Sequence, residues 1–181
     1  GSGKTYTSLR IATGLANGGK IALIDSERGS ASLYADKFNF DVLELDKKNI
    51  EEYISAINEA EKSGYQVLII DSLTHAWIEL LEEIDRISKA KFKGNSWAGW
   101  REGTPQYKKL IDSILSFNGH IIATMRSKTE WGIEQENGKN KPIRIGLSPE
   151  QRQGIEFEFS MVMEINQDHL ANCIKDRTGR F

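Results

Sequence analysis

Apolar residues in the first two thirds of the sequence follow two alternating patterns. Short, mainly apolar runs occupy residues 21–24, 42–45, 67–70 and 120–125. Runs of this kind are typical of strands buried on both faces of a parallel sheet. Between them, apolar residues recur at helical spacing in residues 4–17, 49–62, 73–87 and 106–117, and a shorter helix is predicted over 30–38. The chain therefore alternates between predicted strands and amphipathic helices.

This alternation predicts an α/β fold: a largely parallel sheet with helices on both faces and right-handed crossovers. A loop is predicted over residues 89–103, between two predicted helices. We find no interdomain linker, so residues 1–181 predict a single domain.

The pattern changes after Arg126. Residues 127–149 are polar and turn-rich, with a hairpin tip predicted over residues 136–139. Two antiparallel strands are predicted over residues 157–165 and 169–175. The sequence thus predicts a C-terminal antiparallel extension of the parallel sheet.

Composition narrows the class of protein. A hydrophobic content of 39%, a charged content of 28% and a net charge of −2 are ordinary for a soluble globular protein. Because there is no overall positive field, nucleic-acid binding would depend on local patches. The single cysteine, Cys173, cannot form an internal disulfide, and no apolar run reaches membrane-spanning length. We therefore expect a cytoplasmic protein without a membrane partner.

The first five residues, Gly-Ser-Gly-Lys-Thr, directly precede a predicted helix. Gly3, Lys4 and Thr5 match the end of the phosphate-loop pattern G-x-x-x-x-G-K-[ST]. The flexible backbone of Gly1, Ser2 and Gly3 directs N–H groups at phosphate oxygens, Lys4 adds a positive charge, and the Thr5 hydroxyl ligates Mg²⁺. A glycine turn that begins a helix is the plain alternative. We expect the first glycine of the pattern and the strand leading into the loop to lie before Gly1, so that the domain is truncated at its N-terminus.

Two acidic residues follow predicted strands. Asp71 ends the run 67–70, and Glu27 lies just beyond the run 21–24. Because the carboxyl ends of parallel strands line the ligand crevice, Asp71 is predicted to hold Mg²⁺ together with Thr5. Glu27 is a candidate to orient and polarise the water that attacks the γ-phosphate. Alternatively, Asp71 begins a turn or caps a helix, and Glu27 is a solvated turn residue.

Several of these segments resemble RecA-type recombinases: residues 21–27, residues 34–37, Asp71-Ser72 and Thr124-Met125-Arg126. The resemblance runs over nearly the whole chain. It points to the short phage-encoded RecA-like ATPases associated with single-strand annealing, an AAA-type phage nucleotide-binding family. It implies a RecA-like P-loop fold and the hydrolysis of Mg-ATP in recombination or annealing, in the cytoplasm of a bacterial or phage-infected cell.

The resemblance also implies roles for individual residues. The glutamate at the Glu27 position activates water in that family, and the tyrosine at the Tyr34 position stacks on adenine, while Tyr6 is counted with the nucleotide contacts. Thr124 stands where RecA has glutamine, and we expect its hydroxyl to hydrogen-bond the γ-phosphate or the water. Lys175 and Arg177 match a K-x-R pair that reaches the nucleotide of a neighbouring subunit and neutralises charge in phosphoryl transfer. This implies head-to-tail assembly into a ring or filament; from the residues alone, the pair reads as a solvated turn.

Two segments combine cations with aromatic residues, as single-stranded nucleic-acid sites do. They stand where RecA-like proteins have DNA loops, which implies single-stranded DNA as a partner and a single-strand DNA-binding protein as a further one. The predicted contacts are Lys89, Lys91, Lys93, Trp97, Trp100 and Arg101 in the first segment and Arg126, Lys128 and Trp131 in the second. For the first segment, the alternative is a helix end with its tryptophans in the core or at an interface.

Two other functions stay open. One is a nucleotide-gated module that hydrolyses little and binds a protein through its tryptophan-containing segment. The other is a P-loop phosphotransferase for a small molecule, because a phosphate loop alone does not identify the acceptor.

Overall fold

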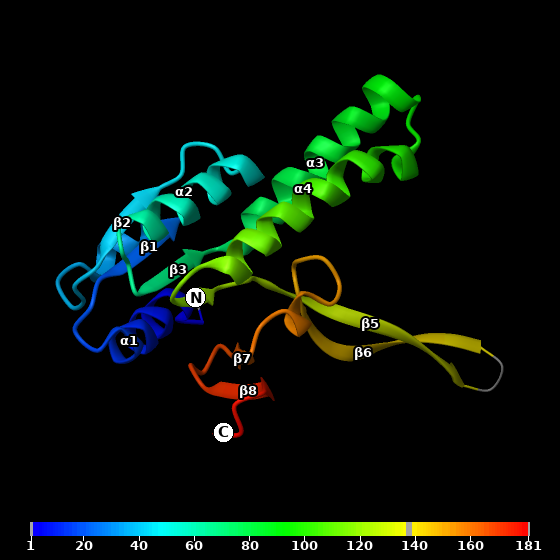
Figure 1. The fold of residues 1–181 in the computed structure, drawn as a ribbon. Helices are drawn as coiled ribbons and strands as arrows, with labels where there is room; N and C mark the ends of the chain where they lie inside the picture. Colours follow the sequence, from blue (N-terminus) through cyan, green and yellow to red (C-terminus); the bar gives the residue numbers. More distant parts are fainter. Residues whose placement is uncertain (1, 137–138, 181) are drawn as a thin grey trace.

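A four-stranded parallel sheet forms the centre of the protein (Figure 1). The structure is a computed structural model that describes residues 2–136 and 139–180, with side chains described outside residues 130–146. The sheet has the order β2-β1-β3-β4, with β1 (Ile21–Asp25), β2 (Asp41–Glu44), β3 (Val67–Asp71) and β4 (His120–Ala123). Asp25 is opposite Asp71 in the register of β1 and β3, so both acids lie at the carboxyl edge. The α/β fold predicted from the sequence is confirmed.

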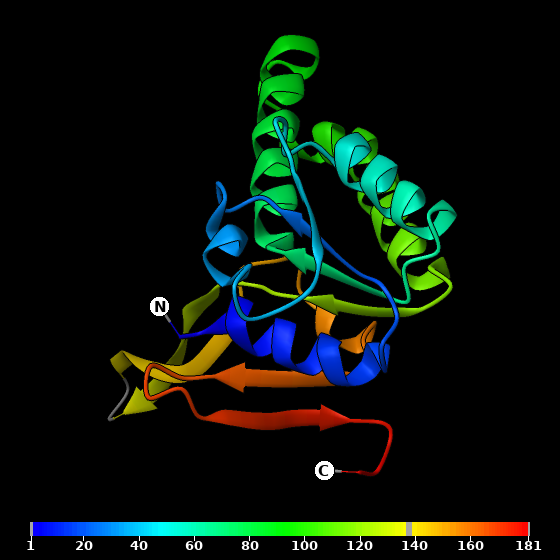
Figure 2. The ribbon, with the colours of Figure 1, turned by 90° about the vertical axis from the view of Figure 1, so that its left-hand side faces the viewer.

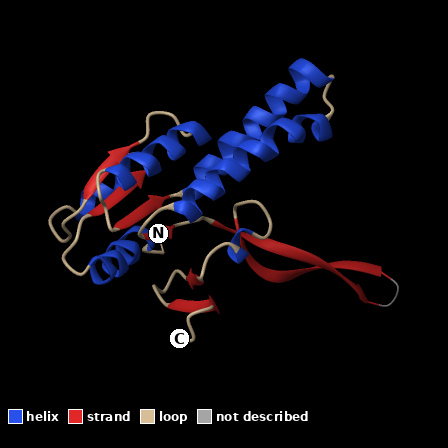
Figure 3. Cartoon of the chain, in the orientation of Figure 1, coloured by secondary structure: helices blue, strands red, loops and turns tan. Residues whose placement is uncertain are grey.

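Helices cover both faces of the sheet, as the side view in Figure 2 and the element colours in Figure 3 show. One face carries α1 (Lys4–Ala16), and the other carries α2 (Ile50–Lys62), α3 (Leu73–Phe92) and α4 (Ser96–Ser116). Along β3, Leu68 and Ile70 pack on the α2 side, whereas Val67 and Ile69 pack with α1. This two-sided burial explains why the run is apolar at every position.

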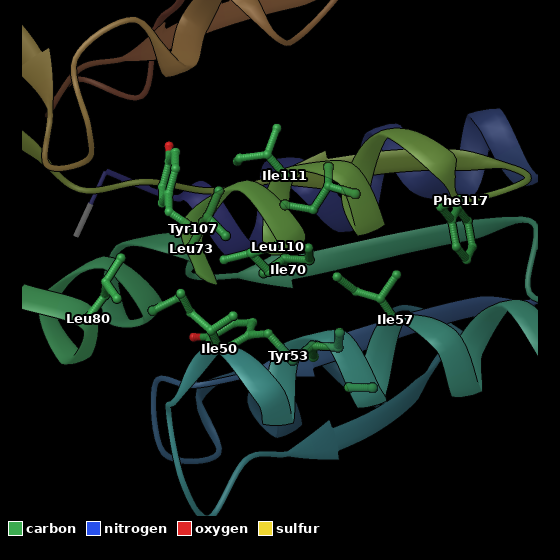
Figure 4. Packing of buried hydrophobic residues seen from close by; sticks show 14 of the residues in the cluster. Ile50, Tyr53, Ile57, Ile70, Leu73, Leu80, Tyr107, Leu110, Ile111 and Phe117 are labelled. Atoms are coloured by element: carbon green, nitrogen blue, oxygen red, sulfur yellow. The ribbon is translucent and has the colours of Figure 1, made fainter. Parts of the chain in front are cut away.

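The larger hydrophobic core lies between α2, α4 and β3 (Figure 4). Tyr53, Ile57 and Leu110 are at most 1% exposed and pack in the same cluster as Ile70. Burial of each large apolar side chain contributes about 1.5–3 kcal/mol. This core therefore stabilises the strand ends that carry Asp25 and Asp71.

The predicted loop over residues 89–103 is wrong. Instead, α3 continues to Phe92 and α4 begins at Ser96, after Asn95, whose side chain accepts a hydrogen bond from the Ala98 amide. The two helices form an antiparallel pair that projects from the sheet (Figure 1). No helix in the described part of the chain is long and apolar enough to cross a bilayer.

Two glycines allow close packing of this segment as a helix. A Cβ on Gly99 would lie 2.0 Å from Ser88 Oγ, and one on Gly103 would lie 2.4 Å from Ile84 Cδ1. Both glycines therefore let α4 approach α3 closely. In sequence they read as loop residues, but here they serve helix packing, which offsets their low helix propensity.

The C-terminal part is antiparallel, as predicted. β5 (Ser127–Glu136) pairs with β6 (Lys139–Pro149), and this long hairpin extends away from the sheet (Figure 1). The predicted tip includes residues 137–138, which lie outside the described residues. A second pair follows, β7 (Met161–Ile165) and β8 (Ala171–Asp176).

Two short 3₁₀ helices replace parts of the predicted elements. The predicted helix over 30–38 is shortened to η1 (Ser30–Tyr34). The strand predicted from residue 157 begins at Met161, because η2 (Ile155–Phe157) occupies the positions before it.

Candidate active site

A cavity of about 710 Å³ opens at the carboxyl edge of the sheet, beside the start of α1. Its wall consists of residues 2–7 with Glu27, Ser30, Tyr34, Asp71, Arg126 and His169. The hydroxyl of Ser30 is buried and has no hydrogen-bond partner among the described residues. The volume is within the usual range of small-molecule sites, about 300–1,000 Å³. The structure thus brings together the chain start and both predicted acids; Gly1 lies outside the described residues.

Asp71 joins three parts of the site. Its side chain is buried at the end of β3, and its residue is 2% exposed. Thr5 Oγ1 donates to Asp71 Oδ2 at 2.5 Å, and Thr124 Oγ1 donates to Asp71 Oδ1 at 2.5 Å. One carboxylate therefore connects the chain start, β3 and the segment after β4. Thr124 is not in the described cavity wall, so its contact with a γ-phosphate stays a prediction.

The contacts of Asp71 and Thr5 fit a magnesium site. A hydroxyl and a carboxylate are hard oxygen ligands, and Mg²⁺ typically combines one or two such groups with phosphate oxygens and water. Asp71 does not cap α3, because the N-cap position belongs to Ser72. The position of Ser72 therefore argues against a capping role for Asp71, and metal binding by Asp71 stays a prediction.

Glu27 lies in the cavity wall and is paired with Arg126. One guanidinium nitrogen of Arg126 is 3.0 Å from Glu27 Oε1 and 2.9 Å from Oε2. Ser72 Oγ is 3.4 Å from Glu27 Oε1, and His75 Nε2 is 3.9 Å away. Burial acts to raise the pKa of Glu27, but the hydrogen bond and charge of Arg126, with smaller effects of His75 and Lys4, lower it overall. Glu27 is thus a carboxylate of weakened basicity.

A polar network of Ser26, Ser72 and His75 lies next to Glu27. His75 Nδ1 is 2.7 Å from Ser26 Oγ, and that hydroxyl also accepts from the Ser72 amide at 2.9 Å. Burial lowers the pKa of His75, although the charge of Glu27 opposes this shift. The network holds the ring beside Glu27, and 13% of the His75 side chain is exposed.

Asp25 is a supporting residue that the sequence interpretation missed. It is 1% exposed, and its carboxylate accepts from the amides of Glu27, at 2.6 Å, and Ala31, at 3.0 Å. These bonds fix the turn after β1 and so the position of Glu27. The available signal was an aspartate directly after the apolar run 21–24, in the same position as Asp71 after the run 67–70.

The predicted base-contacting tyrosines lie on one side of the cavity. Tyr6 and Tyr34 both line it, and their ring centroids are 5.9 Å apart with an interplanar angle of 59°. Tyr6 also meets Phe38 edge-on at 5.3 Å. An aromatic surface therefore adjoins the charged end of the cavity, and stacking on adenine stays a prediction.

Lys175 and Arg177 lie away from the described wall of this cavity. Lys175 Nζ donates to the carbonyls of Glu156, Phe157 and Phe159 at 2.7, 3.0 and 2.8 Å. Arg177 donates to the Phe157 carbonyl at 2.8 Å. Within one chain, both cations thus satisfy carbonyl groups around η2.

The first predicted DNA segment divides into two groups of residues. Trp100 packs against Trp77, with centroids 5.7 Å apart, and under Arg152 at 5.8 Å, as the core alternative anticipated. Trp97, by contrast, is 84% exposed near the start of α4. Lys93 and Arg101 are exposed as well.

The remaining predicted cations differ in their contacts. Lys89 pairs with Asp85 at 2.6 Å, and Lys91 pairs with Glu102 at 3.2 Å. In the second segment, Lys128 is exposed at the start of β5, and Trp131 has a side chain outside the described residues.

Comparison with known families gives a match over almost the whole chain. A family model described as an AAA domain matches residues 1–180, which include the complete cavity wall. No curated protein matches the chain.

Proposed function

The chain belongs to the AAA domain family. We propose that it hydrolyses Mg-ATP, as membership of this family supports, and that it does so while bound to single-stranded DNA, for which the exposed cations and Trp97 are the support. Family membership indicates a nucleotide-binding ATPase of the P-loop type. The observation that carries the proposal is the contact between Thr5 of the chain start and Asp71 of β3 in the wall of one cavity. It joins the two groups that a P-loop ATPase uses for its metal.

We assign the triphosphate to the wall formed by residues 2–5. Backbone N–H groups and Lys4 would stabilise the charge that develops on the phosphoryl group. Thr5 and Asp71 would hold Mg²⁺, which neutralises phosphate charge when bound. Tyr6 and Tyr34 would contact the base.

Glu27 would position the attacking water. Its lowered pKa makes it a weak base, which suits orientation and polarisation of water better than early proton removal. Because one nitrogen of Arg126 contacts both carboxylate oxygens, the water would gain full access to Glu27 only when this pair loosens. Arg126 directly precedes β5, so binding at the β5–β6 hairpin offers a route to that change.

Single-stranded DNA is the proposed partner of the projecting elements. Lys93, Trp97 and Arg101 place two cations and one stacking surface near the free end of the α3–α4 pair, and Lys128 adds a cation on β5. Cations follow the phosphate backbone, while an aromatic face stacks on unpaired bases. Recombination or annealing, with a single-strand DNA-binding protein as a further partner, is the corresponding role.

Assembly is the last part of the proposal. Lys175 and Arg177 would leave the carbonyls around η2 and reach the nucleotide of a neighbouring subunit in a ring or filament. Cations supplied in this way stabilise the transition state of phosphoryl transfer.

The test compares ATPase rates with and without single-stranded DNA for wild type, Glu27→Gln and Arg177→Ala. Because glutamine lacks the charge that orients and polarises the water, Glu27→Gln should hydrolyse ATP much more slowly while still binding nucleotide. Arg177→Lys is the matched control for charge. An unchanged rate in Glu27→Gln or in Arg177→Ala removes the role assigned to that residue.

The exposure of Trp97, together with the ion pairs of Lys89 and Lys91, favours a second candidate: a nucleotide-gated module that binds a protein. Salt separates the two candidates. Affinity for single-stranded DNA falls steeply with salt, whereas a contact centred on Trp97 does not.

A further inference from the structure

The turn between β7 and β8 reaches the chain start, far from it in sequence. In Figures 1 and 2 this turn lies near the N-terminal end of α1. His169 Nδ1 is 3.1 Å from the Ser2 carbonyl oxygen. A Cβ on Gly3 would lie 3.3 Å from the same nitrogen, and His169 lines the cavity together with Lys4 and Thr5. The imidazole therefore lies directly over the backbone that we assign to the triphosphate.

The hydrogen bonds of the turn hold the backbone of His169 in place. Asn166 accepts from the Leu170 amide through its side chain, at 2.9 Å, and from the His169 amide through its carbonyl, at 3.2 Å. His169 has a φ of 63°, a left-handed conformation that histidine, like asparagine and aspartate, adopts more readily than most residues other than glycine. His169 and Leu170 are both exposed, so core packing does not account for this conformation.

The hydrogen bond has a consequence for the peptide that it touches. The Ser2 carbonyl can only accept, so His169 Nδ1 carries the proton. In a planar trans peptide, the carbonyl of Ser2 and the N–H of Gly3 point in opposite directions. Fixing the carbonyl therefore also fixes the direction of the Gly3 N–H, a donor in the predicted phosphate loop.

We propose that His169 is a positioning residue for the phosphate loop: its Nδ1–H holds the Ser2–Gly3 peptide in the orientation that binds the triphosphate. The proposal rests on the proposed function, because it deepens the account of the same site. The β7–β8 hairpin would then act on the phosphate loop of its own subunit. This role is separate from that of Lys175 and Arg177, which are proposed to reach the nucleotide of a neighbouring subunit.

Two substitutions separate the hydrogen bond from the backbone conformation. Asparagine and glycine both tolerate a left-handed φ, but only asparagine places a side-chain N–H near the position of Nδ1. We would measure the Kd for a fluorescent ATP analogue (mant-ATP) with Mg²⁺, and kcat and KM for ATP. Thermal unfolding of each variant checks its fold.

For His169→Gly we expect the Kd and KM to rise roughly three- to tenfold, because one hydrogen bond is lost, and kcat to change little. His169→Asn should bind like wild type. Equal affinities in wild type and His169→Gly would overturn the proposal, and so would equal losses in His169→Gly and His169→Asn.

A second measurement is independent of nucleotide binding. Hydrogen exchange in residues 2–5 of the nucleotide-free protein should be faster in His169→Gly than in His169→Asn or wild type. If wild type binds no nucleotide, the proposed function fails. A difference in exchange between wild type and His169→Gly would then still support the contact of His169 with the loop, and equal exchange in the two proteins would refute that contact.

Discussion

Glu27 and Arg126 are 99 positions apart in sequence, yet the Arg126 guanidinium contacts both Glu27 carboxylate oxygens in the wall of the cavity. Glu27 is the residue proposed to position the attacking water. Its partner, Arg126, directly precedes the β5–β6 hairpin. If Glu27 acts as proposed, this ion pair links hydrolysis to the position of the hairpin.

Arg126→Ala should raise the ATPase rate measured without DNA and reduce stimulation by DNA. The side chains of Arg126 and Glu27 are 45% and 27% exposed, and such pairs contribute about 0.2–1 kcal/mol. Relief of this restraint corresponds to an increase of up to about fivefold in rate. Arg126→Lys keeps the charge but not the planar fork and should be intermediate. A lower DNA-independent rate in Arg126→Ala would show that the pair supports hydrolysis rather than restraining it.

Asp71→Asn should weaken the response to Mg²⁺ without unfolding the protein. The amide oxygen still accepts from one threonine, but the charge that attracts the cation is lost. We expect the Mg²⁺ concentration for half-maximal activity to rise at least tenfold, measured by titration at fixed ATP. Thr124→Val, which removes the other hydrogen bond of Asp71 and keeps its charge, is the control. Equal Mg²⁺ dependence in wild type and Asp71→Asn contradicts the metal assignment.

The parallel sheet and its acidic edge are predictable from the sequence because both depend on local pattern. A run buried on both faces is apolar at every position, and the acid that follows it marks the carboxyl end; Asp71 shows both features. The pairing of Arg126 with Glu27 depends instead on how the segment after β4 crosses the edge of the sheet, which no local spacing encodes. The loop predicted over residues 89–103 is wrong for a different reason. It contains Gly99 and Gly103, and glycine is typical of loops but also permits close packing of helices.

Tyr53→Phe tests the support beneath the site. The Tyr53 hydroxyl donates to the Ser72 carbonyl at 2.9 Å, and that carbonyl also accepts from Ser26 Oγ at 3.1 Å. Since the carbonyl keeps one donor, the variant should lose about 0.5–1.5 kcal/mol of unfolding free energy at pH 8.

The pH dependence of the same variant should differ from wild type above pH 10. Burial raises the pKa of Tyr53 from 10.0 to about 12. A raised pKa gives stability that is complete below the unfolded value and is lost as the pH rises toward 12. The difference in unfolding free energy between wild type and Tyr53→Phe should therefore shrink between pH 8 and pH 11 in urea titrations. A constant difference over that range argues against a buried, protonated hydroxyl.

Trp97 and Trp100 are three positions apart and should respond oppositely to alanine substitution. Trp100 packs between Trp77 and Arg152, so Trp100→Ala should lose about 2 kcal/mol of unfolding free energy. Trp97 is 84% exposed, and Trp97→Ala should change stability by less than about 0.5 kcal/mol. If Trp97 stacks on a base, its loss should weaken binding of single-stranded DNA by about 1–3 kcal/mol. Fluorescence anisotropy of a labelled oligonucleotide at two salt concentrations measures this, with Trp97→Phe retaining an aromatic face. Wild-type affinity in Trp97→Ala would exclude stacking by Trp97 and leave the DNA proposal to the exposed cations, Lys93 and Arg101 in the first segment and Arg126 and Lys128 in the second.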